Sequence, residues 1–248
     1  KISKKIFKEF KNLNINFDYN SLKRFFIFNY VPAPRTIYKN ISKAKNSFFY
    51  EFDIKNFSCK EFEYNNFFNI KHSETKNNSI DTLDEMLEDS IKSRLITDQK
   101  IGLFLSGGID STLIAWYAKK LDQDIESFTV SVKGKTFDEV DNAKKLSSYL
   151  NIKNHSVDLD KDKFEKIYQK ILNKIDEPTG APSLIPTFMA SQLASKHVKS
   201  VLSGDGGDEI FGGYEIFKYL KIFNLFEFFM NKKTSSLLEL FLFALPIS

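Results

Sequence analysis

The chain has 248 residues, of which 42% are hydrophobic and 27% are charged, a balance typical of a globular protein and not of a disordered chain. Its 36 basic and 32 acidic side chains leave a formal net charge of only +4, which is too weak to argue for a nucleic-acid partner. No apolar run reaches the roughly 18 residues of a membrane span, so we expect no membrane partner either.

Residues 1–70 are rich in Phe and Tyr and hold no catalytic constellation of side chains. The pattern predicts a helix over residues 17–30 and short strands over residues 47–52 and 56–64. The only cysteine, Cys59, lies in the second of these strands, and we interpret it as a packing residue. A single cysteine cannot form a disulfide within the chain, which fits a cytoplasmic protein.

The polar stretch 71–79 has no periodicity and predicts a linker. Beyond it, apolar residues at spacings of three and four alternate with short apolar runs. Strands that alternate with helices of this length predict an α/β fold with a parallel sheet, whose ligands sit beyond the carboxyl ends of the strands. Helices are expected over residues 80–95, 109–121, 137–150, 164–175 and 184–196, and strands over 101–105, 128–132, 152–159 and 198–202.

The first candidate motif is Leu-Ser-Gly-Gly-Ile-Asp-Ser-Thr, residues 105–112, between a predicted strand and a predicted helix. Its two glycines permit a tight turn, and the N–H groups at the start of the helix favour an anion. The motif is neither a Walker A loop nor a dinucleotide fingerprint. A carboxylate beside bound phosphate, here that of Asp110, requires a divalent cation such as Mg²⁺ between them. A simple glycine-rich turn with Asp110 at the helix start is the alternative.

The second motif is Ser-Gly-Asp-Gly-Gly-Asp-Glu-Ile-Phe-Gly-Gly-Tyr, residues 203–214. Five glycines and three acids between residues 204 and 214 suit neither an ordinary helix nor an ordinary strand. In a parallel sheet this loop emerges at the same edge as the first motif, where its carboxylates can meet Mg²⁺, the proton of a nucleophile or a cationic group. The alternatives are a calcium-binding or a purely turn-forming loop, although the EF-hand pattern fails.

Two further features are weaker. Residues 176–186, with three prolines, can shape a substrate pocket, but a turn before a helix capped by Ser183 explains them equally well. The three histidines, His72, His155 and His197, are scattered in the sequence and predict no metal site.

The motif at 106–112 resembles the pyrophosphate loop of the PP-loop ATP pyrophosphatases, and the motif at 203–214 resembles that of the glutamine-dependent asparagine synthetases within that superfamily. The segments 137–139, 176–186 and 30–38 also fall where this family has them, the last resembling the end of its glutaminase domain. The resemblance implies a parallel, doubly wound sheet with flanking helices. It divides the chain into the remnant of a glutaminase domain over 1–70, a linker over 71–79 and an ATP-binding synthetase domain over 80–248 that is incomplete at its C-terminus.

The resemblance also implies a reaction. ATP activates the side-chain carboxylate of aspartate as an acyl-adenylate, pyrophosphate leaves, and ammonia derived from glutamine attacks the acyl group to give asparagine. Family likeness assigns Mg²⁺ to Asp110 and Asp208, and formation of the intermediate or handling of the ammonia proton to Asp205. The residues assigned to ATP and pyrophosphate are Leu105, Ser106, Gly107, Gly108, Asp110, Ser111, Thr112, Val130, Ser203 and Gly204, and those assigned to the substrate pocket are Glu177, Ser183, Gly206, Gly207 and Glu209. A homodimer is a further expectation.

Three departures from the family pattern bear on this interpretation. The N-terminal cysteine nucleophile of the glutaminase domain is not in the chain, and the C-terminal basic residues of the family would lie beyond Ser248, so we expect a fragment with little activity of its own. Ala181 replaces an expected Asp, which leaves the acceptor open. The alternatives are the same chemistry on another carboxylate, such as a sugar acid of surface-polysaccharide synthesis, or a non-catalytic remnant that binds a nucleotide or a partner.

Overall fold

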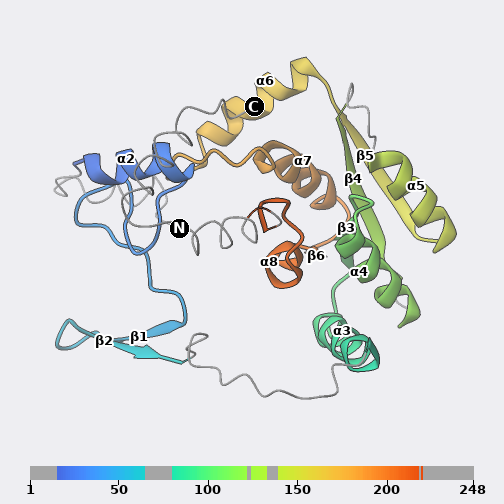
Figure 1. The fold of residues 1–248 in the computed structure, drawn as a ribbon, viewed down its shortest axis with the longest axis horizontal. Coiled ribbons are helices and arrows are strands. Elements are labelled where there is room, and N and C mark those ends of the chain that lie inside the picture. The colour runs from blue at the N-terminus through green and yellow to red at the C-terminus, as the bar shows by residue number, and fades with distance from the viewer. Residues whose placement is uncertain (1–15, 65–79, 122–123, 133–138, 218, 220–248) are drawn as a thin grey trace, which may run out of the picture.

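The computed structural model describes residues 16–64, 80–121, 124–132, 139–217 and 219, and two sheets organise them (Figure 1). One sheet is an antiparallel pair of strands near the N-terminus, and the other has four strands. The predicted linker 71–79 and residues 137–138 of the family motif lie outside the described residues. No helix in the described ranges combines the length and the apolar character that a membrane crossing requires.

The four-stranded sheet is parallel throughout. Its strands are β3 (Ile101–Phe104), β4 (Glu126–Val132), β5 (Lys153–Leu159) and β6 (Ser200–Leu202), in the order β5-β4-β3-β6. In chain order, β4 is added beside β3 and β5 beside β4. The chain then returns across the sheet, and β6 pairs with the other side of β3. The strand order therefore reverses between β3 and β6, and in open α/β sheets ligands bind at such a switch point, outside the carboxyl ends of the strands.

Helices cover both faces of this sheet, as a doubly wound fold requires (Figure 1). On one face, α4 (Ile109–Lys120) packs on β3 and α5 (Glu139–Tyr149) on β4 and β5, with α3 (Ile80–Arg94) against α4. Leu103, Ala115 and Ala143 are fully buried in that core. On the other face, α7 (Leu184–Ala194) packs on β4 and β5, and α6 (Lys161–Leu172) packs on α7. The predicted α/β class is thus confirmed.

The N-terminal part contains α2 (Tyr19–Phe28) and the hairpin of β1 (Phe48–Asp53) with β2 (Ser58–Glu63), close to the predicted ranges. Asp18 caps α2 by accepting a hydrogen bond from the Asn20 N–H at 3.1 Å. Every residue of β2 is exposed, so the interpretation of Cys59 as a packing residue is wrong: its thiol is free and lies at the surface. The hairpin lies apart from the four-stranded sheet in Figure 1.

One short helix was not expected from the sequence. Residues Gly207–Phe211 form α8, within the stretch 204–214 that was predicted to suit no ordinary helix or strand. The physical reason is that glycines stand at its two ends, where Gly206 (φ 95°) and Gly212 (φ 68°) adopt left-handed conformations that other residues rarely reach. The four residues after Gly207, Asp-Glu-Ile-Phe, carry no helix-breaking side chain.

Candidate functional site

A pocket of about 330 Å³ opens at the switch point of the sheet, a size suited to a small ligand. It brings together the two glycine-rich motifs, the end of β3, the middle of β4 and one side of α7. Its walls are formed by Phe104, Leu105, Ser106, Gly108, Asp110, Ser111, Phe128, Val130, Pro186, Thr187, Ala190, Ser203, Gly204, Asp205 and Asp208.

The first motif forms a turn whose hydroxyls are arranged around the start of α4. Gly107 has φ 84°, a conformation that favours glycine, and the Gly108 N–H donates to Ser106 Oγ at 3.2 Å. Ser111 Oγ lies 3.1 Å from Ser106 Oγ and donates to the Gly108 carbonyl, which also accepts from Thr112 Oγ1 at 2.7 Å. These internal hydrogen bonds stabilise the turn, and the positive end of the α4 dipole is directed at the pocket.

The second motif packs directly against the first. A Cβ atom on Gly204 would lie 2.9 Å from Asp110 Cβ, and one on Gly207 would lie 2.6 Å from Asp110 Cγ. Both distances are too short for real Cβ contacts, so glycine at these two positions is what allows the loops to meet. The Gly207 N–H also donates to the Gly204 carbonyl at 3.1 Å and closes the turn after β6.

The pocket is acidic. Asp110, Asp205 and Asp208 line it, and no Lys or Arg does so among the described residues. A triphosphate could not bind beside three carboxylates without a cation to separate the charges. Two of these residues, Asp110 and Asp208, come from the two opposing loops, so their carboxylates line the pocket from both. Oxygen ligands of this kind fit a Mg²⁺ ion that shares its coordination with phosphate.

The pocket wall includes four residues that were not expected from the sequence: the apolar Phe104, Phe128 and Ala190, and Thr187 with its hydroxyl. Phe128 is only 1% exposed, and its ring fills the space above Gly102, where a Cβ atom would lie 2.5 Å from Phe128 Cε2. In the sequence these residues look like any other part of a buried strand or helix. The glycine within β3 was the one available sign that a large side chain lies over it.

Comparison with known proteins identifies the family of this chain. The family model described as asparagine synthase matches residues 82–242, which include both glycine-rich motifs. The chain belongs to the asparagine synthase family. It is 31% identical over 208 residues to asparagine synthetase (glutamine-hydrolyzing) 1 of Bacillus subtilis, an alignment that covers 83% of this chain and 32% of that protein.

A second relative is putative asparagine synthetase (glutamine-hydrolyzing) 2 of Methanocaldococcus jannaschii, 32% identical over 206 residues, with 82% of this chain and 39% of that protein covered. The match thus spans 32% and 39% of the lengths of these two relatives. Among solved structures, the NH3-dependent NAD synthetase of Campylobacter jejuni aligns with 20% identity and a TM-score of 0.39, over 54% of this chain and 60% of that one.

Several residues assigned to the site through the family resemblance lie outside the pocket wall. Gly107 and Thr112 belong to the first turn, and Gly206, Gly207 and Glu209 to the second, so these five remain beside the pocket without lining it. Ser183 precedes α7 at its N-cap position, but its side chain makes no capping hydrogen bond.

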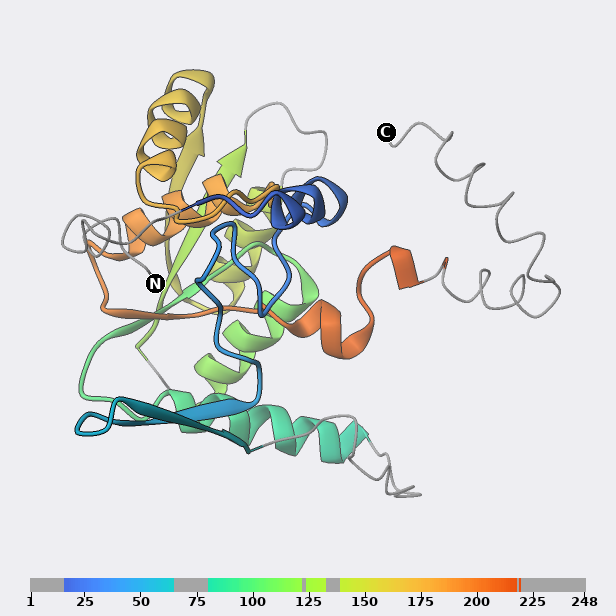
Figure 2. The same cartoon turned by 90° about the vertical axis from the view of Figure 1, so that its left-hand side faces the viewer.

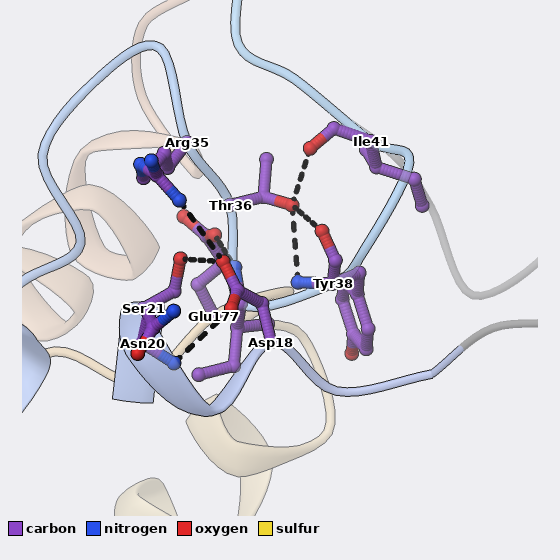
Figure 3. A network of polar contacts seen from close by, with 9 residues as sticks. Asp18, Asn20, Ser21, Arg35, Thr36, Tyr38, Ile41 and Glu177 are labelled. Carbon is purple, nitrogen blue, oxygen red and sulfur yellow. Dashed lines mark hydrogen bonds and ion pairs between the residues drawn. The ribbon is translucent and has the colours of Figure 1, made fainter. Parts of the chain in front are cut away.

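Glu177 lies elsewhere altogether. Glu177 belongs to the network of polar contacts beside Asp18 and Arg35 (Figure 3), where its Oε1 accepts a hydrogen bond from the Ile37 N–H at 2.7 Å. Its Oε2 lies 2.7 Å from Lys43 Nζ. Both oxygens are therefore occupied by the segment that follows α2. The Gly180 N–H donates to the Asn29 carbonyl at 2.8 Å nearby, and Figure 2 shows α2 beside the chain that leads into α7. Glu177 joins two parts of this family member and does not line the pocket at the switch point; it lines a separate cavity of about 350 Å³ with Lys43 and Asp176.

Glu209 is also engaged by a neighbour. Tyr214 donates its hydroxyl proton to Glu209 Oε1 at 2.6 Å, which lowers the pKa of the Glu209 carboxyl and raises the pKa of the Tyr214 hydroxyl to about 12. The hydrogen bond links the start of α8 to the residues after it. Glu209 therefore shapes the second loop from outside the pocket.

Proposed function

We propose that this chain is the ATP-binding part of an enzyme that activates a carboxylate as an acyl-adenylate and transfers ammonia to it, with aspartate as the acceptor and asparagine as the product. The observation that carries the proposal is the contact of the two glycine-rich loops around Asp110 at the switch point of the sheet. Membership of the asparagine synthase family supports the same chemistry.

In the first step, an acceptor carboxylate oxygen attacks the α-phosphorus of ATP, the bond between the α-phosphorus and its bridging oxygen breaks, and pyrophosphate leaves. Ser106, Gly108 and Ser111 stand where backbone N–H groups, hydroxyls and the α4 dipole can stabilise that leaving group. Asp110 and Asp208 would hold Mg²⁺. When bound, the ion offsets the negative charge that the phosphates and the carboxylates bring together.

The base of ATP requires an apolar site, and Val130, Phe104 and Ala190 provide one beside the phosphate turn. Leu105 is 1% exposed and fixes the strand end from which the turn starts, while Ser203 and Gly204 approach from the end of β6. We assign these residues to the adenosine part of the nucleotide. Their position at the carboxyl ends of neighbouring parallel strands is the usual place for a nucleotide in such a sheet.

In the second step, the nitrogen of ammonia attacks the acyl carbon, AMP leaves with the electrons of the broken carbon–oxygen bond, and the nitrogen loses a proton. Asp205 lines the pocket from the second loop, and its N–H donates to Ser203 Oγ at 3.3 Å. We assign to this carboxylate the acceptance of that proton, because a positioned base adjacent to the reacting group speeds such a transfer.

The N-terminal residues support a second proposal about organisation. Residues 1–70 would be the end of a glutaminase domain that supplies ammonia, residues 71–79 the linker, and residues 80–248 the synthetase domain. The contacts of Glu177 with Ile37 and Lys43 would then be made across the boundary of the two domains. A cytoplasmic location and a homodimer complete the proposal.

The experiment measures pyrophosphate released by the full-length protein in the presence of Mg²⁺ and ATP, with aspartate and with a panel of other acids that includes sugar acids. Release that depends on aspartate supports the proposal. Release with another acid alone would replace the acceptor and keep the chemistry. If no acid gives release and ATP with Mg²⁺ produces no thermal shift, the adenylation proposal is wrong.

A further inference from the structure

Two of the three histidines, which the sequence analysis treated as scattered, come together with a carboxylate behind the pocket. Glu126 begins β4, His155 lies on β5, and His197 follows α7. Each offers one ligand atom, and these three atoms all lie within 4.8 Å of one another. Neither the adenylation chemistry nor the acceptor uses this cluster.

The cluster is at the opposite end of the strands from the phosphate turn. Along β4, Val130 and Phe128 line the pocket, and Glu126 follows on the same face at the start of the strand. The Phe128 ring separates the two sites: it lines the pocket on one side and lies against both imidazoles on the other, with centroid distances of 5.3 Å to His155 and 5.8 Å to His197.

We propose that Glu126, His155 and His197 form a site for a divalent transition-metal ion, with Zn²⁺ as the best fit. Two imidazoles and one carboxylate are a donor set that zinc accepts with a solvent molecule as the fourth ligand. An all-oxygen site of the kind that suits Mg²⁺ has no imidazoles, so the donors distinguish this cluster from the pocket carboxylates.

The carboxylate is prepared for such a role. Glu126 is only 7% exposed, so its carboxylate is largely shielded from water. Lys100 Nζ lies 2.8 Å from Oε1, whereas Oε2 faces His155 Nε2 at 2.8 Å. One oxygen is therefore held by a lysine, and the other is directed at the imidazoles.

The two histidines differ in their exposure to solvent. The His155 and His197 rings are stacked with centroids 4.0 Å apart, and His197 is exposed, so its ring can turn toward an ion without disturbing the core. A bound ion would fasten the segment between α7 and β6 to the starts of β4 and β5. Because α7 also carries Pro186, Thr187 and Ala190, the ion would stabilise the helix that forms one wall of the pocket.

The cluster also contains a competitor. Two lysine ammonium groups lie close to Glu126 Oε1, that of Lys100 at 2.8 Å and that of Lys153 at 3.8 Å. A divalent ion at Oε2 would have to share the carboxylate with them. Removal of one competing charge should therefore tighten metal binding, whereas removal of a ligand should weaken it. These opposite directions separate coordination from general attraction to a negative surface.

The test is a titration of the chelator-treated full chain with Zn²⁺, followed by calorimetry and by the melting temperature, with Co²⁺ as a spectroscopic substitute. We expect one ion per chain and a higher melting temperature. His197→Gln, an exposed ligand whose replacement should not harm folding, should weaken binding at least about tenfold, and Lys100→Gln should strengthen it several-fold. Two controls, His72→Gln at the remaining histidine and Asp110→Asn in the pocket, should bind like the unaltered chain.

The proposal is overturned if the chain binds no stoichiometric Zn²⁺, if His197→Gln binds as well as the unaltered chain, or if Asp110→Asn alone abolishes binding, which would place the ion in the pocket. Failure of Lys100→Gln to tighten binding would remove Glu126 from the ligand set. None of these outcomes is read from pyrophosphate release, so a failure of the zinc proposal leaves the adenylation proposal standing.

Discussion

The Asp110 carboxylate occupies the space that a side chain on Gly207 would need, with Asp110 Cγ only 2.6 Å from the position of a Cβ atom. Because of this contact, the position of the Asp110 side chain in the first loop depends on the presence of glycine at position 207 in the second. It also explains how two turns that each end a different strand leave a single pocket between them.

This contact predicts coupled stability. Gly207→Ala should lower the free energy of unfolding by about 1–3 kcal/mol, since an added methyl group in a filled space forces its neighbours to move. In an Asp110→Ala background, where Cγ is absent, the same replacement should cost less than about 0.5 kcal/mol. Urea unfolding of the four proteins forms a double-mutant cycle. Equal costs in both backgrounds would show that the two residues do not meet.

Asp110 should matter for the reaction and little for the fold. Asp110→Asn keeps the size of the side chain and removes its charge, so pyrophosphate release should fall at least about 100-fold if the carboxylate holds the cation of the nucleotide. The melting temperature should hardly change, because the side chain faces the pocket. Asp89→Asn, at an exposed position of α3, is the matched control and should release pyrophosphate normally. Unchanged release by Asp110→Asn would refute the metal role.

The sequence predicts most of the fold, because the apolar spacing of the helices and the apolar runs of the strands are strong and alternate regularly. It also predicts the meeting of the loops after β3 and β6, since parallel strands end at one edge. Prediction from the sequence fails where a residue that belongs to the core also lines the pocket. Phe128 and Ala190 look like core residues, and nothing in their spacing indicates that they also line a pocket.

Long-range polar contacts could not be predicted from the sequence. The family resemblance assigned Glu177 to the substrate pocket, but its two oxygens bind a backbone N–H and a lysine from a segment about 140 residues earlier. His155 and His197 likewise meet only because β5 and the end of α7 are adjacent in the fold. In both cases the tertiary arrangement, and not the local pattern, decides which groups become partners.

The position of Glu177 predicts a loss of stability in place of a loss of acceptor affinity. Glu177→Ala should cost about 1–3 kcal/mol, because it leaves the Ile37 N–H and Lys43 without their partner. Glu177→Gln should cost less, since its amide oxygen can still accept from Ile37. The measurements are urea unfolding and the KM for the acceptor in the full-length protein.

Glu165→Gln, an exposed position of α6, serves as the control for these variants and should match the unaltered protein in both measurements. A large increase in the acceptor KM for Glu177→Gln, with unchanged stability, would return this residue to the substrate pocket and contradict its place in the structure.

The cap of α2 predicts a pH-dependent stability. Asp18 Oδ2 accepts from Ser21 Oγ at 2.8 Å, and this hydrogen bond, with the N–H of Asn20 and the charge of Arg35, lowers the pKa of the carboxyl below its ordinary value of 3.8. A carboxyl with a lowered pKa in the folded state contributes stability above its ordinary pKa, and this contribution is lost as the pH falls through the lowered value.

The melting temperature of Asp18→Ala should therefore lie below that of the unaltered protein near neutral pH, and the difference should shrink as the pH falls below about 4. Asp18→Asn keeps an oxygen that can cap the helix but has no charge to lose. Its deficit should be smaller at neutral pH, because only the charge-dependent part of the Ser21 and Arg35 contacts is removed. A difference between Asp18→Ala and the unaltered protein that stays constant from neutral to acidic pH would show that the charge of Asp18 does not contribute.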